Sequence, residues 1–170
     1  MSKDNAKLLQ ILFKNTGSTT ALLEAIAGED IDVEIIQENE IQDRRLSSLF
    51  NWGCQLILRV TILKNKKHNL SYNIVIYDPN KLNMFKESFA KLDYPIGKLL
   101  EDIDYQRKVQ YSGWKNKKNL SKYFNFEDLI NLDKMDYPVK EYLHIHDGQV
   151  LFYISEIYDI ETISKIFIQK

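Results

Sequence analysis

Disulfides, membrane-spanning segments and an excess of either charge are all missing from this chain of 170 residues. Its single cysteine, Cys54, excludes an intramolecular disulfide and any cysteine-based metal cluster. No apolar run approaches the roughly 20 residues that span a bilayer, and the amino terminus has no apolar stretch typical of a signal peptide. The 23 basic and 24 acidic residues nearly balance, unlike those of a general nucleic-acid binder. We therefore expect a soluble intracellular domain that binds no nucleic acid.

Common catalytic motifs and arginine are also scarce. The chain has no P-loop, no GxGxxG and no GxSxG motif. It has only four arginines against 19 lysines. Because arginine presents a forked set of donors, each of the few that remain is a candidate for a specific role. They are Arg44, Arg45, Arg59 and Arg107.

Hydrophobic residues make up 44% of the chain, which is enough for one core, and we expect residues 1–170 to form a single domain. Helical spacing of apolar residues predicts helices at 6–14, 21–27, 79–91, 126–132 and 159–167. Alternating or continuous apolar residues predict strands at 31–41, 56–63, 70–77, 103–111, 142–145 and 150–158. The strongest hairpin signal is Asp147-Gly148 between two apolar runs. The pattern predicts an α+β fold, with a single antiparallel sheet flanked by helices.

Two charged residues stand in strands that ought to be buried, Arg59 in the run 56–63 and Glu156 in the run 150–158. Side chains alternate along a strand, so each shares a face with apolar neighbours. An unpaired buried charge is unfavourable. Either the two residues pair with each other, or one face of the sheet is wet, or they line a concave site. In such a site Arg59 would bind an anionic ligand and Glu156 would act on a hydroxyl or a proton.

Other candidates carry weaker signals. His144 and His146 form an HxH pair, which is one way to present two imidazoles to a metal. No third ligand is identifiable, and histidines that face solvent beside a hairpin turn are far more common, so we expect no metal. Cys54 has no Cys-His-acid pattern around it and is expected to be a small buried hydrophobe. The lysine clusters at 64–67 and 115–118 are expected to be solvated loops.

Three segments, in order, resemble the chorismate lyase-like family. They are Gly17 to Ala25 with Gly28 and the strand 33–36; Leu58-Arg59-Val60-Thr61-Ile62-Leu63 with its partner 72–77; and Pro95-Ile96-Gly97-Lys98-Leu99-Leu100, followed downstream by Asp147-Gly148-Gln149 and the strand 154–158. Each motif is short, and their order and spacing carry the resemblance. It covers most of the chain, roughly from Gly17 to Tyr158.

The resemblance implies an antiparallel sheet that encloses a small aromatic acid beneath helical flaps. Arg59 would grip the carboxylate of that acid, and the backbone of Ile96 and Gly97 would contact the same group. Glu156 would meet the ring oxygen at the far end. The expected ligand is chorismate or a related aromatic acid.

The implied reaction converts chorismate to 4-hydroxybenzoate and pyruvate, a step that supplies quinone synthesis. Glu156 would donate a proton to the ether oxygen of the leaving group. No metal and no organic cofactor is required. The location would be the cytoplasm, or the plastid stroma for a plastid-encoded chain, where the quinone would be plastoquinone.

Two positions depart from the family pattern. Bacterial lyases carry a second arginine on the returning hairpin strand, where this chain has Ile74, and an RxR pattern is replaced by Glu141-Tyr142-Leu143-His144. We consider His144 a partial substitute. The alternative function is a non-catalytic, effector-type domain that binds an aromatic acid. A transcription regulator would need a helix-turn-helix module before this domain, and the roughly 16 residues before Gly17 are too few for one.

Overall fold

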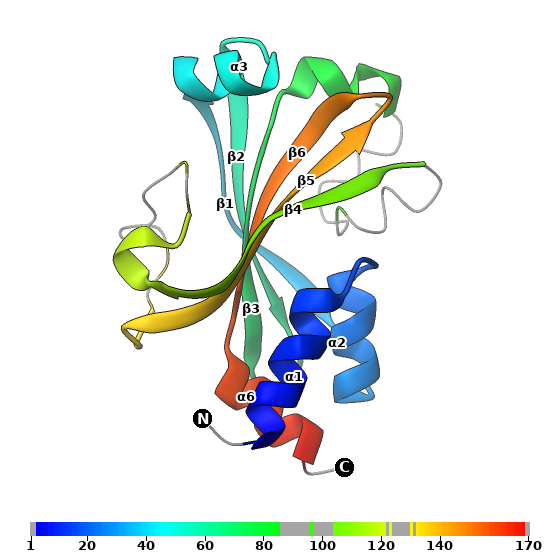
Figure 1. Ribbon diagram of the computed structural model, residues 1–170, viewed down its shortest axis with the longest axis vertical. Helices are drawn as coiled ribbons and strands as arrows, with labels where there is room; N and C mark the ends of the chain where they lie inside the picture. Colours follow the sequence, from blue (N-terminus) through cyan, green and yellow to red (C-terminus); the bar gives the residue numbers. More distant parts are fainter. Residues whose placement is uncertain are drawn as a thin grey trace.

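The computed structural model describes residues 3–85, 96, 104–121, 123, 130 and 132–168. Within these residues, six strands form one antiparallel sheet in the order β1-β2-β3-β6-β5-β4 (Figure 1). The strands are β1 (Asp32–Gln42), β2 (Gln55–Lys64), β3 (Asn69–Tyr77), β4 (Gln106–Asn116), β5 (Asp136–His146) and β6 (Gln149–Tyr158). The α-helices are α1 (Lys3–Lys14), α2 (Thr19–Ala27), α3 (Arg44–Phe50) and α6 (Ile160–Ile168). The prediction of an α+β fold with a single antiparallel sheet is confirmed.

Helices cover the two ends of the sheet differently. Helices α1, α2 and α6 lie together at one end, where both chain termini are found, and α3 lies at the other end (Figure 1). Leu8, Leu12 and Leu23 of the first two helices pack with Leu70 and Ile163 in one core cluster. The amphipathic spacing of these helices therefore buries their apolar faces against the sheet and against α6.

The two faces of the middle strands differ in character. Leu58, Val60 and Ile74 point into a core cluster on one side of the sheet. On the other side, alternate residues such as Arg59 and Thr61 point into a cavity. The alternation of strand side chains thus separates a mostly apolar face from a face that carries several polar groups.

Some predicted elements differ from the observed ones. Residues 79–85 form a 3-10 helix, η1 (Pro79–Phe85), in place of the first part of the predicted helix 79–91; the Lys81 amide donates to the Asp78 carbonyl, which winds the tighter turn. The rest of that helix and most of 126–132 lie outside the described residues. The strand predicted at 103–111 runs from Gln106 to Asn116, followed by a short 3-10 helix, η2 (Lys117–Asn119).

Helix α3 was not predicted, although its amino terminus carries a recognisable signal. The Asp43 side chain accepts hydrogen bonds from the amides of Arg45 and Leu46, at 2.9 and 3.0 Å. Asn51 ends the helix in the left-handed region, with a φ of 55°.

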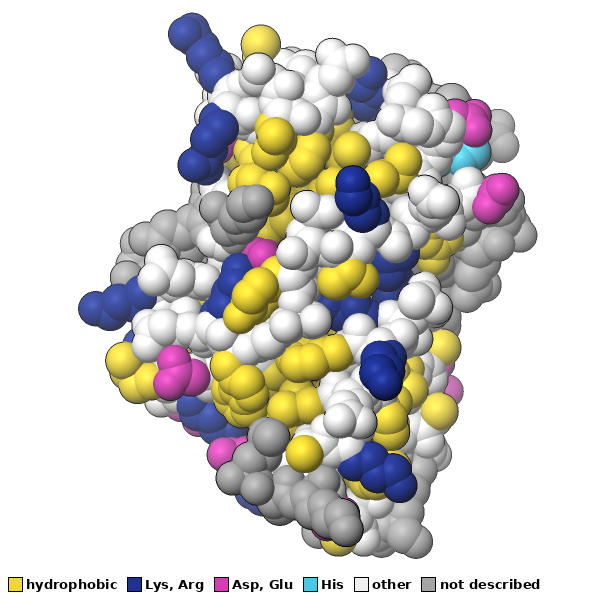
Figure 2. Space-filling view, viewed as in Figure 1, with side chains coloured by type: hydrophobic (Ala, Val, Ile, Leu, Met, Phe, Trp, Pro, Cys, Tyr) yellow, Lys and Arg dark blue, Asp and Glu magenta, His cyan; other side chains and the backbone are white. Residues whose placement is uncertain are grey.

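The surface gives two further observations. None of the described helices is long and apolar enough to cross a membrane. On the face drawn in Figure 2, lysine and arginine side chains are spread out among hydrophobic and neutral ones and do not form a single stripe.

Candidate functional site

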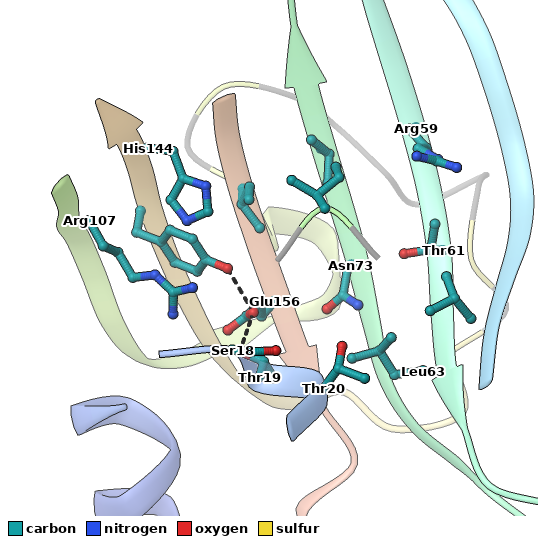
Figure 3. A pocket seen from close by; sticks show the side chains of 15 residues that line it. Ser18, Thr19, Thr20, Arg59, Thr61, Leu63, Asn73, Arg107, His144 and Glu156 are labelled. Atoms are coloured by element: carbon teal, nitrogen blue, oxygen red, sulfur yellow. Dashed lines mark hydrogen bonds between the residues drawn. The ribbon is translucent and has the colours of Figure 1, made fainter. Parts of the chain in front are cut away.

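A cavity lies on the polar face of the sheet, beneath the start of α2 (Figure 3). Its space is about 560 Å³, including open solvent at the mouth. The alternation of strand residues puts side chains from all six strands of the sheet on this one face. The lining residues are Ser18, Thr19, Thr20, Val33, Arg59, Thr61, Leu63, Asn73, Val75, Ile96, Arg107, Tyr142, His144, Ile154 and Glu156.

Arg59 lies on the β2 side of the cavity and is only 4% exposed. Its Nε lies 3.1 Å from Oε2 of Glu38, its register partner on β1. In Figure 3 the guanidinium is turned toward the β1 edge. The alternative in which Arg59 pairs with Glu156 is therefore wrong: Glu38 balances its charge, because antiparallel pairing places the two side by side on adjacent strands.

Glu156 lies at the centre of the cavity and is 3% exposed. Its Oε1 accepts hydrogen bonds from Thr19 Oγ1 at 2.6 Å and Tyr142 Oη at 2.8 Å, and its Oε2 accepts one from Tyr158 Oη. Burial, together with the Glu156 charge, raises the pKa of both tyrosines well above 10. Both phenols therefore stay protonated, and three hydroxyls donate hydrogen bonds to the one carboxylate.

Arg107 reaches into the cavity from β4, with its guanidinium directed toward Glu156 (Figure 3). Its Cζ lies 4.2 Å from the centroid of the Tyr142 ring, a cation-π distance. Its Nε and Nη1 are buried and have no hydrogen-bond partner among the described residues. Burial lowers the pKa of Arg107, but Tyr142 and Glu156 outweigh burial and raise it, so the guanidinium is charged.

His144 is the register partner of Arg107 on β5 and is 1% exposed. Both of its ring nitrogens are buried, and neither has a hydrogen-bond partner in the part of the chain that the structure describes. The ring packs against Tyr105 and Tyr142, with centroid distances of 4.5 and 5.2 Å. Burial, and then the charge of Arg107, lowers the pKa of His144 from 6.5 to about 3. The imidazole is therefore neutral at physiological pH, with one N–H donor and one acceptor.

Comparison with known families identifies the chain. Residues 13–165 match the family described as chorismate pyruvate-lyase Rv2949c-like. The chain belongs to this family. The resemblance noted in the sequence is thereby confirmed, and the family has the α+β architecture described above.

Solved structures share the fold at low sequence identity. The effector domain of PhnF from Mycobacterium smegmatis is 9% identical, with a TM-score of 0.60 over 85% of this chain and 89% of that one. Full-length PhnF gives the same TM-score, and the match covers 64% of its length. A GntR-family transcriptional regulator from Bacillus cereus is 12% identical, with a TM-score of 0.50 over 78% and 93% of the two chains. No curated protein gives a significant match.

Four of the site residues expected from the sequence line this one cavity: Arg59, Ile96, His144 and Glu156. Gly97 lies outside the described residues. The expectation that both histidines of the HxH pair face solvent is wrong for His144, which is buried and lines the cavity, while His146 Nδ1 lies 2.6 Å from the Asp104 carbonyl oxygen. No cluster of three metal-ligating side chains occurs within the described ranges.

Two expectations from the sequence need correction. Cys54 is exposed and so is not a small buried hydrophobe; it lies in the turn that precedes β2. Ile74 faces the apolar core on the opposite side of the sheet, with no exposed surface. Its neighbours Asn73 and Val75 line the cavity. In this chain, therefore, β3 brings no arginine to the site.

Sequence reasoning did not place Arg107, Thr19 or Tyr142 in the site. The scarcity of arginine singled out Arg107 but gave no direction for its side chain. Thr19 sits at the first position of α2, where Ser18 accepts a hydrogen bond from the Ala21 amide as N-cap. That cap fixes the start of the helix and so places the Thr19 hydroxyl over Glu156.

A further buried cation, Lys140, lies beside Glu156 on the adjacent strand. Lys140 pairs in register with Glu156 and has no exposed surface. Its Nζ donates to the carbonyl oxygen of Leu12 at 3.2 Å and to that of Asn15, at the end of α1. Burial lowers the pKa of Lys140, and the Glu156 carboxylate acts in the opposite direction. Lys140 therefore ties the first helix to the centre of the sheet.

Proposed function

We propose that the chain is a chorismate pyruvate-lyase, which eliminates pyruvate from chorismate and leaves 4-hydroxybenzoate for quinone synthesis. The observation that supports this most strongly is the enclosure of Arg59 and Glu156 in one cavity of a chain that belongs to a chorismate pyruvate-lyase family. The solved structures of similar fold include an effector domain and a domain described as ligand-binding, which supports a ligand-binding role for this fold.

In this proposal Arg59 holds the ring carboxylate of chorismate, and the backbone around Ile96 and Gly97 contacts the same group. Arg59 keeps its Glu38 partner on the β1 side, and the ligand approaches from the cavity side. Glu156 faces the hydroxyl-bearing end of the ring. Three of the four acceptor positions of its carboxylate are filled by protein hydroxyls, which leaves one for the substrate.

These three donors favour a base at Glu156 in place of the proton donor expected from the sequence. Glu156 would accept the proton from C4 of the ring as the C3–O bond breaks. The electron pair of that bond leaves with the enolate oxygen of pyruvate, and the proton returns to the methylene carbon to give the methyl group. Aromatisation of the ring supplies the driving force, so the protein mainly positions and desolvates the substrate.

The test is to incubate the purified protein with chorismate and to follow 4-hydroxybenzoate by ultraviolet absorbance and pyruvate by a coupled assay. Equimolar appearance of both products is expected. Glu156→Gln should lower turnover by about 100-fold or more while product affinity changes far less, because only proton transfer is lost. The matched control is Glu141→Gln, an equally buried glutamate that lies outside the cavity lining and bonds to Tyr153 and Lys115.

Arg59→Met should weaken 4-hydroxybenzoate binding by about 30-fold or more, because a carboxylate would lose its charged partner. Unchanged product affinity would remove Arg59 from the site. An effector-binding role without catalysis is the second candidate, favoured by the similarity to the PhnF effector domain. Binding of 4-hydroxybenzoate without any turnover of chorismate would establish that role and refute the lyase.

A further inference from the structure

The cavity contains two adjacent groups whose hydrogen-bonding capacity the protein itself does not use. Four atoms, Arg107 Nε and Nη1 and the two ring nitrogens of His144, are buried and have no hydrogen-bond partner within the described ranges. The two residues are register partners on β4 and β5. Buried polar atoms are nearly always hydrogen-bonded in folded proteins, so two such groups side by side and open to a cavity indicate a ligand.

The charges around the cavity leave one positive charge in excess. Arg59 is paired with Glu38. Glu156 is bonded to three hydroxyls, faces Lys140 across the β5–β6 ladder and is the carboxylate toward which the Arg107 guanidinium is directed (Figure 3). Arg107 rests on the Tyr142 ring, and no ion pair involves it within the described residues. Three cations thus share two carboxylates, so one positive charge at the cavity has no anion.

We propose that Arg107 and His144 form a second carboxylate subsite, so that the cavity selects an aromatic or cyclohexadienyl acid with two carboxylates over one with a single carboxylate. This rests on the proposed function, in which Arg59 holds the first carboxylate. A guanidinium binds a carboxylate through two parallel N–H donors, and a neutral imidazole adds a third donor without adding charge. The subsite thus carries one positive charge, which matches one carboxylate.

The position of the subsite specifies where the second carboxylate must be. Figure 3 shows Arg107 and His144 on one side of Glu156 and Arg59 on the other. The second carboxylate therefore lies at the hydroxyl end of the ring, away from the first. In chorismate the enolpyruvyl group is attached to the carbon next to the one that carries the hydroxyl, so its carboxylate would reach Arg107 while the hydroxyl meets Glu156. This second cation takes the place of the arginine that β3 lacks.

The experiment compares two stable probes by isothermal titration calorimetry. One is 3-(carboxymethoxy)-4-hydroxybenzoate, which has two carboxylates, and the other is 4-hydroxy-3-methoxybenzoate, which has one. The protein should bind the dicarboxylate at least about tenfold more tightly, because a close charge pair is added. Arg107→Met should abolish this preference and leave the affinity for the monocarboxylate within about twofold. Lys108→Met, at the exposed neighbour on β4, is the matched control and should change neither affinity.

Three outcomes would overturn the subsite. The preference for the dicarboxylate could survive in Arg107→Met, Arg107→Met could weaken the binding of both probes equally, or neither probe could bind to the unmodified protein. Should Arg107→Met fail to fold, Arg107→Lys provides the test: it keeps the charge but loses the fork, and the preference should fall to an intermediate value. The lyase assay is independent. Turnover of chorismate with an unchanged preference in Arg107→Met refutes the subsite alone, and an Arg107-dependent preference without turnover refutes the lyase alone.

Discussion

Replacement of His144 by phenylalanine should make the stability of the protein less sensitive to acid. In the folded protein, burial and the Arg107 charge lower the pKa of His144 to about 3, against 6.5 for an unperturbed histidine. As the pH falls below 6.5 the unfolded chain therefore takes up a proton at this position and the folded chain does not. The free energy of unfolding falls accordingly, by about 1.4 kcal/mol for each pH unit well below 6.5.

Between pH 7 and pH 5 this histidine alone should remove about 2 kcal/mol of stability. Urea unfolding of the protein and of His144→Phe at both pH values measures the effect as a difference, in which other titrating groups cancel. Phenylalanine suits the position because the ring already packs against Tyr105, Tyr142 and Phe152. The control is His68→Phe, at an exposed histidine, which should keep the original pH response. If the free energy of unfolding falls by the same amount between pH 7 and pH 5 in the protein and in His144→Phe, His144 is not a neutral, buried imidazole.

Three further changes test the contacts that support the site. Ser18→Ala removes the N-cap of α2 and should lower the free energy of unfolding by about 0.5–2 kcal/mol in urea titrations, and no change would mean that the cap is dispensable. Tyr153→Phe removes the 2.6 Å hydrogen bond to the buried Glu141, at a cost of about 1.5–3 kcal/mol by the same measurement; a smaller loss would show that Lys115 suffices for this carboxylate. Lys140→Met leaves two carbonyls at the end of α1 without their donor and should cost about 2–4 kcal/mol, with amide hydrogen exchange increased first in α1; an unchanged α1 would contradict the anchoring role.

Most of the fold could be predicted from the sequence because its local signals agree with the tertiary structure. The Asp147-Gly148 turn is an example: both residues have positive φ, 47° and 73°, as a tight hairpin between twisted strands requires. Helix α3 was missed because seven residues contain too few apolar positions to show a helical period, and only its Asp43 cap marks it.

The site was predictable only in part. Arg59 and Glu156 stood out because each interrupts a strongly apolar strand. Arg107 did not stand out in the same way, because β4 is an edge strand that is largely exposed. The residue pattern of β4 does not show that this one side chain turns inward. The pairing of Arg59 with Glu38 depends on a register that shifts between Ile35 and Gln37, and such a bulge cannot be read from alternation.

The place of β6 in the sheet has a consequence for the order in which the protein can be assembled. Of the six strands of this sheet β6 is made last, yet it lies between β3 and β5 and joins the two halves of the sheet. Until residues 149–158 are made, β1–β3 and β4–β5 are separate pieces with open edges that invite pairing with other chains. Because β6 also carries Glu156, a nascent chain that stops before β6 lacks the central group of the cavity. The cavity is therefore completed only when β6 has been made and has joined the sheet.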